Sequence, residues 1–151
     1  MATWAEFATM APELAEAGRK LFFQHGVGLG YLATIRKDGG PRMHPMCPVI
    51  TDDGLYAFII ASPKRGDLLR DGRYAMHSFP PEAVDDEFYL AGTAAPVPSP
   101  EKRAQIAAGY HFPVPDEHQL FTFDVERCLL VTYKYRGDMS PTHQRWRATK
   151  K

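Results

Sequence analysis

Six short runs of strand-forming residues follow one another along this chain, with turn residues between them. The runs cover residues 30–35, 42–50, 55–61, 74–79, 88–97 and 120–135. The Asp38-Gly39 pair is a strong hairpin signal, and T-D-D-G at 51–54 marks the next turn. Strands and helices do not alternate regularly, which disfavours a doubly wound parallel sheet. The sequence therefore predicts a mainly β, α+β domain built on a small antiparallel barrel.

The second and third runs are expected to occupy different places in the sheet. Pro45 and Pro48 cannot donate hydrogen bonds to a neighbouring strand, so run 42–50 is expected at an edge, bulged, or open on one side. Run 55–61 is almost entirely apolar, which indicates burial on both faces. An open strand beside a buried one leaves room for a ligand.

Three helices are expected between or before the strands. Residues 11–24 predict an N-terminal helix, with Pro12 in the first turn and glycines after the last. A second helix is expected to begin near Pro63 or Lys64, and a third at Ser99 as N-cap with Pro100 at the first position. We treat 1–151 as one domain, with a helical segment at 1–27 and a polar tail at 137–151.

Composition excludes several functional classes. The formal net charge of the 151 residues is zero, so the extended basic surface of a nucleic-acid-binding protein is not expected. No apolar run is long enough to span a bilayer and no signal-peptide pattern opens the chain, which favours a cytoplasmic protein away from membranes. Cys47 and Cys128 are expected to be free thiols. Loop 111–118 has the wrong spacing for a metal site, so no metal is predicted.

Segment 62–73, S-P-K-R-G-D-L-L-R-D-G-R, has the features of an anion site. Free backbone N–H groups at a helix N-terminus and the helix dipole favour negative charge, and Ser62, Lys64 and Arg65 add donors and positive charge. The alternative is an ordinary N-cap beside solvated surface cations. The absence of G-x-G-x-x-G and G-x-x-x-x-G-K-[ST] argues against a Rossmann or NTPase phosphate loop.

Three stretches together resemble a known family. Residues 31–50 read Y-L-A-T-I-R-K-D-G-G-P-R-M-H-P-M-C-P-V-I, residues 53–76 read D-G-L-Y-A-F-I-I-A-S-P-K-R-G-D-L-L-R-D-G-R-Y-A-M, and the tail contains T-H-Q-R-W-R. Their order and spacing resemble the pyridoxamine 5′-phosphate oxidase-like, FMN-binding split-barrel family over about residues 28–98. The resemblance implies a six-stranded antiparallel split β-barrel with Greek-key topology, which binds its cofactor across a homodimer interface.

The resemblance also implies where a flavin binds. The backbone of the strand after the hairpin is expected beside the ring, the end of the apolar strand along the ribityl chain, and two cations at the phosphate. The tail is expected near a flavin held mainly by the partner, or packed on its own barrel. The implied residues are Arg42, Met43, His44, Pro45, Ile60, Ala61, Ser62, Lys64, Arg65, Trp146 and Arg147.

These features predict an FMN-dependent oxidoreductase that acts on a small organic substrate. A flavin carries redox chemistry itself, so the lack of a catalytic triad or carboxylate pair is expected, and no catalytic residue is identified. Residues 110–136 do not resemble the vitamin B6 oxidase, which disfavours that substrate. The alternatives are an F420-dependent reductase and a non-catalytic protein that binds or senses a flavin, the deazaflavin F420 or haem.

Overall fold

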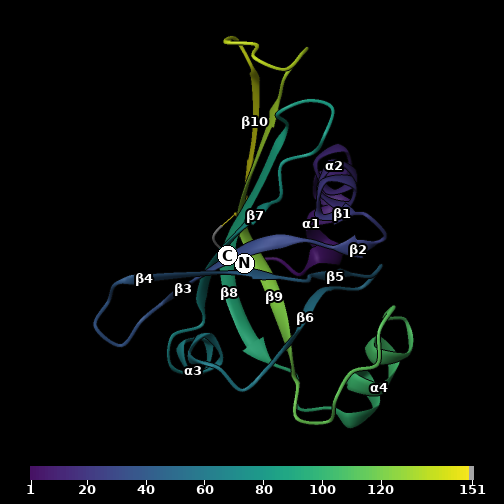
Figure 1. Cartoon of the computed structure of the whole chain (residues 1–151), viewed down its shortest axis with the longest axis vertical. Helices are drawn as coiled ribbons and strands as arrows, with labels where there is room; N and C mark the ends of the chain where they lie inside the picture. Colours follow the sequence, from purple (N-terminus) through teal and green to yellow (C-terminus); the bar gives the residue numbers. More distant parts are fainter. Residues whose placement is uncertain (150–151) are drawn as a thin grey trace.

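The structure is a computed structural model that describes residues 1–149. Its helices are α1 (Trp4–Met10), α2 (Pro12–Phe22), α3 (Pro63–Arg70) and α4 (Pro100–Ala108) (Figure 1). Its strands are β1 (Phe23–Gln24), β2 (Val27–Gly28), β3 (Gly30–Ile35), β4 (Pro41–Met46), β5 (Val49–Ile50), β6 (Leu55–Ile59), β7 (Arg73–Ser78), β8 (Glu87–Pro96), β9 (Gln119–Thr132) and β10 (Thr142–Arg147).

One eight-stranded antiparallel sheet organises the molecule. Its strand order is β4-β3-β7-β8-β9-β6-β5, and β10 pairs with β9. β4 and β5 lie at opposite ends of this order, yet only Cys47 and Pro48 separate them in the chain. The sheet must therefore curl until its two edges nearly meet. This confirms the predicted α+β fold on an antiparallel split barrel.

The strand with two prolines lies at the sheet edges. Among the residues described, β4 pairs only with β3 and β5 only with β6. The prediction of an edge or open strand is confirmed, but run 42–50 forms two strands because Pro48 cannot continue the ladder. Gly39 has φ 83° in the predicted hairpin turn, a conformation that glycine adopts without steric cost.

Helix α4 explains why β6 is apolar on both sides. Inward residues of β6 join the main core, while Tyr56 packs with Ile106 of α4 and Leu120 of β9 in a second cluster. Leu55, Ala57 and Ile59 are at most 1 % exposed. The predicted two-sided burial is confirmed for Leu55–Ile59. It is wrong for the last two residues of run 55–61, because Ile60 and Ala61 lie beyond the end of β6 and are exposed.

The two ends of the chain contain elements that the sequence reading lacked. Helix α1 precedes the predicted helix, and a Thr3–Glu6 capping box begins it. Helix α2 ends at Phe22, two residues earlier than expected, because the chain continues directly into the β1–β2 hairpin. The polar tail forms β10, whose residues pair with β9 from Thr142↔Thr132 to Arg147↔Arg127. None of the described helices has the length and apolar character needed to cross a membrane.

Candidate functional site

Helix α3 begins where the sequence placed it, with Ser62 as N-cap and Pro63 in the first turn. The Ser62 hydroxyl does not cap the helix, since it donates to the carbonyl of Ile60 at 3.0 Å. The carbonyl of Ser62 accepts from the N–H groups of Arg65 and Gly66. Within residues 1–149 the N–H of Lys64 has no hydrogen-bond partner, so it is available to a ligand.

The Lys64 ammonium is half-buried and has no carboxylate partner in the described part of the chain. Burial lowers its pKa, and the nearby Cys47 thiol opposes that shift. The same thiol lies close enough to the hydroxyl of Tyr110 to affect its titration. Burial, with a further contribution from Cys47, raises the pKa of Tyr110 to about 12. Lys64, Cys47 and Tyr110 form what we call the Lys64 cluster.

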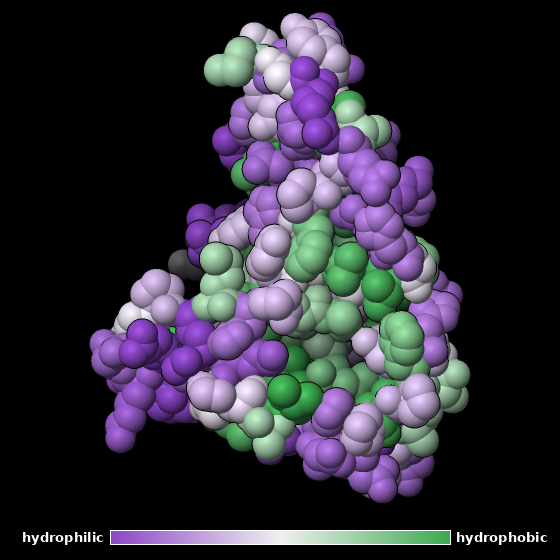
Figure 2. All heavy atoms as spheres, viewed as in Figure 1, coloured by the Kyte–Doolittle hydropathy of each residue, from purple (hydrophilic) through white to green (hydrophobic). Residues whose placement is uncertain are grey.

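Aromatic rings adjoin the Lys64 cluster. Phe58 of β6 lies 5.8 Å from Tyr110, and Phe112 lies 6.1 Å from Tyr110, measured between ring centroids. The guanidinium carbon of Arg103 in α4 lies over the Phe58 ring, 5.5 Å from its centroid. Figure 2 shows apolar side chains gathered in a hollow at the level of β5 and β6, beside the strongly hydrophilic surface of the β3–β4 hairpin. This combination suits a flat apolar ligand with an anionic end.

His44 lies on the inward side of β4. His44 pairs with Leu32 of β3. Leu32, Met76 and Leu90 are cross-strand neighbours that form a buried row across the sheet. The Nε2 atom of His44 is buried and has no hydrogen-bond partner among the described residues. Leaving a buried polar atom unpaired costs about 1–3 kcal/mol. The unpaired nitrogen makes His44 a candidate for a hydrogen bond to a ligand, and its predicted role at a flavin stays a prediction.

The remaining predicted cations point elsewhere. Arg42 does not join the Lys64 cluster, because its Nε donates to Asp67 of α3 at 2.7 Å. Arg65 donates to the carbonyl of Glu117 in the loop before β9 at 2.9 Å. Ile60 is 47 % exposed and Ala61 is also exposed, at the end of β6. The roles predicted for these four residues at a flavin stay predictions.

The tail residues lie on opposite faces of the sheet. Trp146 pairs with buried Cys128 and packs against Phe7 of α1, with ring centroids 4.9 Å apart. Arg147 pairs with Arg127 on the outward face and is within 3.4 Å of Glu126. The packing predicted as the alternative for Trp146 is therefore present within the chain. Contacts of either residue with a partner's flavin stay predictions.

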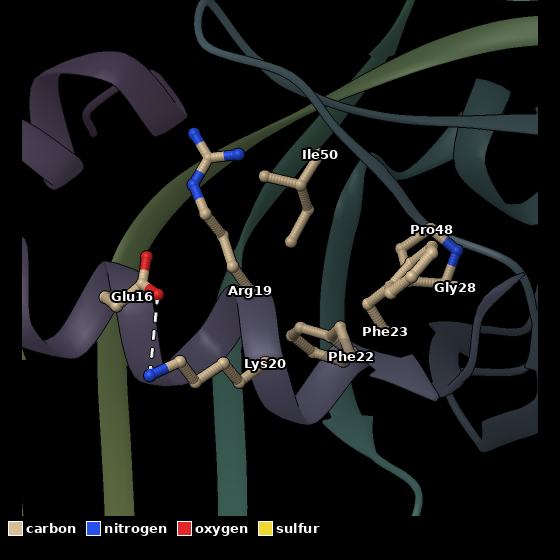
Figure 3. A pocket seen from close by; sticks show the side chains of 8 residues that line it. All are labelled: Glu16, Arg19, Lys20, Phe22, Phe23, Gly28, Pro48 and Ile50. Atoms are coloured by element: carbon tan, nitrogen blue, oxygen red, sulfur yellow. Dashed lines mark ion pairs between the residues drawn. The ribbon is translucent and has the colours of Figure 1, made fainter. Parts of the chain in front are cut away.

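A separate cavity of about 420 Å³ lies between α2 and β5 (Figure 3). None of the predicted site residues lines it. Its cations already have partners: Lys20 pairs with Glu16 at 3.6 Å, and Arg19 donates to the carbonyl of Thr51 at 3.0 Å. We assign no role to this cavity.

Sequence reasoning missed Cys47, which lies near Lys64, and also Tyr110 and Phe58, which follow Cys47 in a chain of neighbouring side chains. No local signal singles them out, since Cys47 sits between two prolines and Tyr110 in a loop of weak pattern. Only the closing of the barrel brings them to α3. In the part of the chain that the structure describes, no group of three or more histidine, cysteine or acidic residues is placed to hold a metal ion.

No protein-family model and no curated protein matches this sequence. Solved structures do resemble it. A NimC/NimA family protein from Clostridium acetobutylicum has 13 % identity and a TM-score of 0.67, over 94 % of this chain and 96 % of that one. A protein of the pyridoxine phosphate oxidase family from the same organism, related to general stress protein 26, has 13 % identity and a TM-score of 0.60, over 93 % and 94 %.

A haem-binding protein from Mycobacterium smegmatis has 19 % identity and a TM-score of 0.58, and the match covers 80 % of this chain and 55 % of that one. Identities this low establish the fold alone. The chain has the split-barrel fold of pyridoxamine 5′-phosphate oxidase-like proteins, as its sequence predicted.

Proposed function

We propose that this split barrel binds FMN, with the phosphate at the start of α3, and that it acts as a flavin-dependent oxidoreductase on a small organic substrate. The observation that carries the proposal is the half-buried, unpaired Lys64 ammonium. A buried cation without a counter-charge is costly, and an anion beside it would offset that cost. The free N–H of Lys64 and the helix dipole favour the same ligand.

The neighbouring residues fit the rest of the cofactor. Phe58 and Tyr110 offer aromatic surface, and the unpaired Nε2 of His44 offers a hydrogen bond to a polar ring atom. When bound, a flavin supplies hydride and electron transfer. The chain's part is to hold the phosphate, orient the ring and exclude water. The substrate and the electron donor are not identified by any residue.

The Lys64→Ala substitution tests the phosphate assignment. It should weaken FMN binding roughly 10- to 100-fold, because losing one charge-assisted hydrogen bond to phosphate costs about 1.5–3 kcal/mol. Flavin fluorescence titration measures the dissociation constant. Lys134→Ala, an exposed lysine after β9, is the matched control and should bind as wild type does. A wild-type protein that binds no FMN, or equal affinities for both variants, would reject the assignment.

A haem-binding role is the second candidate. One protein of the same fold is a haem-binding protein, and a histidine nitrogen without a partner is a suitable iron ligand. The absorption spectrum of the purified protein separates these cofactors, since flavins, deazaflavins and haem absorb differently. Anaerobic mixing of the loaded protein with NADH, NADPH or reduced deazaflavin then separates an enzyme from a binding protein. Absence of cofactor reduction by all three donors would favour the binding protein.

We also propose a homodimer formed through the outward face of the sheet. One row of paired residues on this face runs Met43, Ala33, Ala75, Ala91, and ends at Arg127 and Arg147. Met43 is 69 % exposed, and Tyr31 stacks on Phe79 in the same region. A row of small apolar residues with an exposed methionine suits contact with a second copy. Arg147 shares this face and would lie within reach of a partner.

The Met43→Asp substitution tests the homodimer. A carboxylate in the interface should weaken self-association at least about ten-fold, because it would lose its hydration there without gaining a partner. Sedimentation equilibrium measures the effect, with Met139→Asp as control at a residue that is 90 % exposed in the loop before β10. A monomeric wild-type protein, or an M43D protein as dimeric as wild type, would contradict the proposal.

A further inference from the structure

A second cationic site, whose lining does not include Lys64, lies between α3 and the β3–β4 hairpin. The cavity measures about 460 Å³, and we call it the hairpin cavity. Four cations line it, together with two carboxylates. They are Arg36, Lys37, Arg42 and Arg70, with Asp38 and Asp67. The lining therefore has an excess of two positive charges.

Asp67 organises the floor of the hairpin cavity. Its carboxylate is only 3 % exposed and accepts hydrogen bonds from Arg42 Nε at 2.7 Å, Thr34 at 2.9 Å and Arg70 at 3.1 Å. Arg70 also donates to the carbonyl of Ile35. These bonds fix two guanidinium groups from different elements, one on β4 and one on α3, before any ligand arrives.

Several donors in the hairpin cavity remain free. Arg42 uses only its Nε, so within residues 1–149 its two terminal nitrogens have no partner. Lys37 has no ion pair or hydrogen bond with a described residue, and Nη1 of Arg70 has none either. Arg36 is paired only with Asp38, at 3.4 Å on the exposed hairpin.

If Asp67 served only to hold α3 to the sheet, one arginine partner would be enough. The other cations around the hairpin cavity would then have no role. One arginine neutralises Asp67, and the second arginine adds repulsion that the carboxylate cannot offset. Arg36 and Lys37 then add charge around a space that no protein group fills. Like charges gathered around a cavity are stabilised when an anion enters it.

We propose that the hairpin cavity binds the phosphate group of a small phosphorylated molecule, at a site separate from the flavin phosphate at Lys64. The two free terminal nitrogens of Arg42 match two phosphate oxygens in bidentate geometry, and Nη1 of Arg70 adds a single donor. The volume lies within the range of small-molecule sites, so the cavity has space for more than a lone phosphate. This site goes beyond the proposed flavin chemistry and does not depend on it.

The test is an NMR titration of the ¹⁵N-labelled full chain with inorganic phosphate and, separately, with AMP. It uses FMN-saturated protein if FMN binds, and the protein as purified if it does not. Saturable shifts are expected at Gly66 and at the hairpin. Tighter binding of AMP than of phosphate would identify a nucleotide-like ligand, and equal affinities would identify the free anion.

Variants separate this site from the one at Lys64. Arg42→Gln should weaken binding of either probe at least ten-fold, while Lys64→Gln and the exposed control Arg136→Gln should leave it unchanged. If Arg42→Gln does not fold, the Arg36→Gln/Lys37→Gln double variant is used instead, because this double variant leaves the hydrogen bonds of Asp67 intact. The double variant should weaken binding of either probe several-fold. No saturable binding by wild type, or loss only in Lys64→Gln, overturns the proposal, whatever the outcome with FMN.

Discussion

Replacing Asp67 with asparagine should lower the free energy of unfolding at neutral pH by about 2–4 kcal/mol. The substitution leaves Arg42 and Arg70 without their shared counter-charge. It also replaces one of the two acceptor oxygens by an NH2 group, so the three hydrogen bonds to Asp67 cannot all be kept. Both arginines keep part of their hydration, so the loss should be smaller than for a fully buried pair. Urea unfolding followed by far-UV circular dichroism measures the change.

The same substitution should change the response to acid. Burial alone would raise the pKa of Asp67, but hydrogen bonds from Arg42, Thr34 and Arg70 outweigh it and hold the pKa below its ordinary value of 3.8. A carboxyl whose pKa is lower in the folded state than in the unfolded state stabilises the fold at a pH above its unfolded-state pKa. This stabilisation is lost as the pH falls through the folded-state pKa. The difference in the free energy of unfolding between wild type and Asp67→Asn should therefore become smaller below about pH 4.

The control is Asp116→Asn, at an exposed position in the loop before β9. Surface changes of this kind usually stay within about 0.5 kcal/mol. If Asp67→Asn is no more destabilising than Asp116→Asn, the hydrogen bonds of Asp67 do not hold α3 to the sheet.

Phe88→Ala should destabilise the fold by about 3–5 kcal/mol, the usual cost of removing a buried aromatic ring. Phe88 of β8 is fully buried, meets Phe22 edge-to-face with centroids 5.6 Å apart, and lies directly over Gly18 of α2. A Cβ at Gly18 would come within 2.5 Å of this ring, so the glycine is what lets α2 approach the sheet. The cavity left by alanine would separate the helix from its support.

Thermal and urea unfolding measure this effect against Phe112→Ala, a phenylalanine that is 58 % exposed. The control should lose less than about 1 kcal/mol, because little of its ring leaves water on folding. Similar losses for the two variants would show that α2 packs on the sheet in some other way.

Elements at the chain ends were harder to predict than those in the middle. Helix α1 has only seven residues, and Trp4 and Phe7 stabilise it by packing into the core. Its Thr3–Glu6 capping box was a visible signal, but short helices depend on tertiary contacts. Strand β10 shows no alternation of apolar and polar residues in the sequence, because most of its side chains are exposed and only Trp146 packs on the core. The sequence pattern therefore gave no strand signal there.

The sequence by itself determined the strands in the middle of the chain, the hairpin at Asp38-Gly39, the start of α3 and the open edge at β4, because turn chemistry and proline restrictions act locally. Only the tertiary structure decided which cations meet. Arg42 and Thr34 form hydrogen bonds with Asp67, which is 25 and 33 residues away in the sequence. Lys64 lies near Cys47, whereas Arg42 pairs with Asp67 instead. Sheet register sets these contacts, since a shift of one residue would turn inward side chains outward.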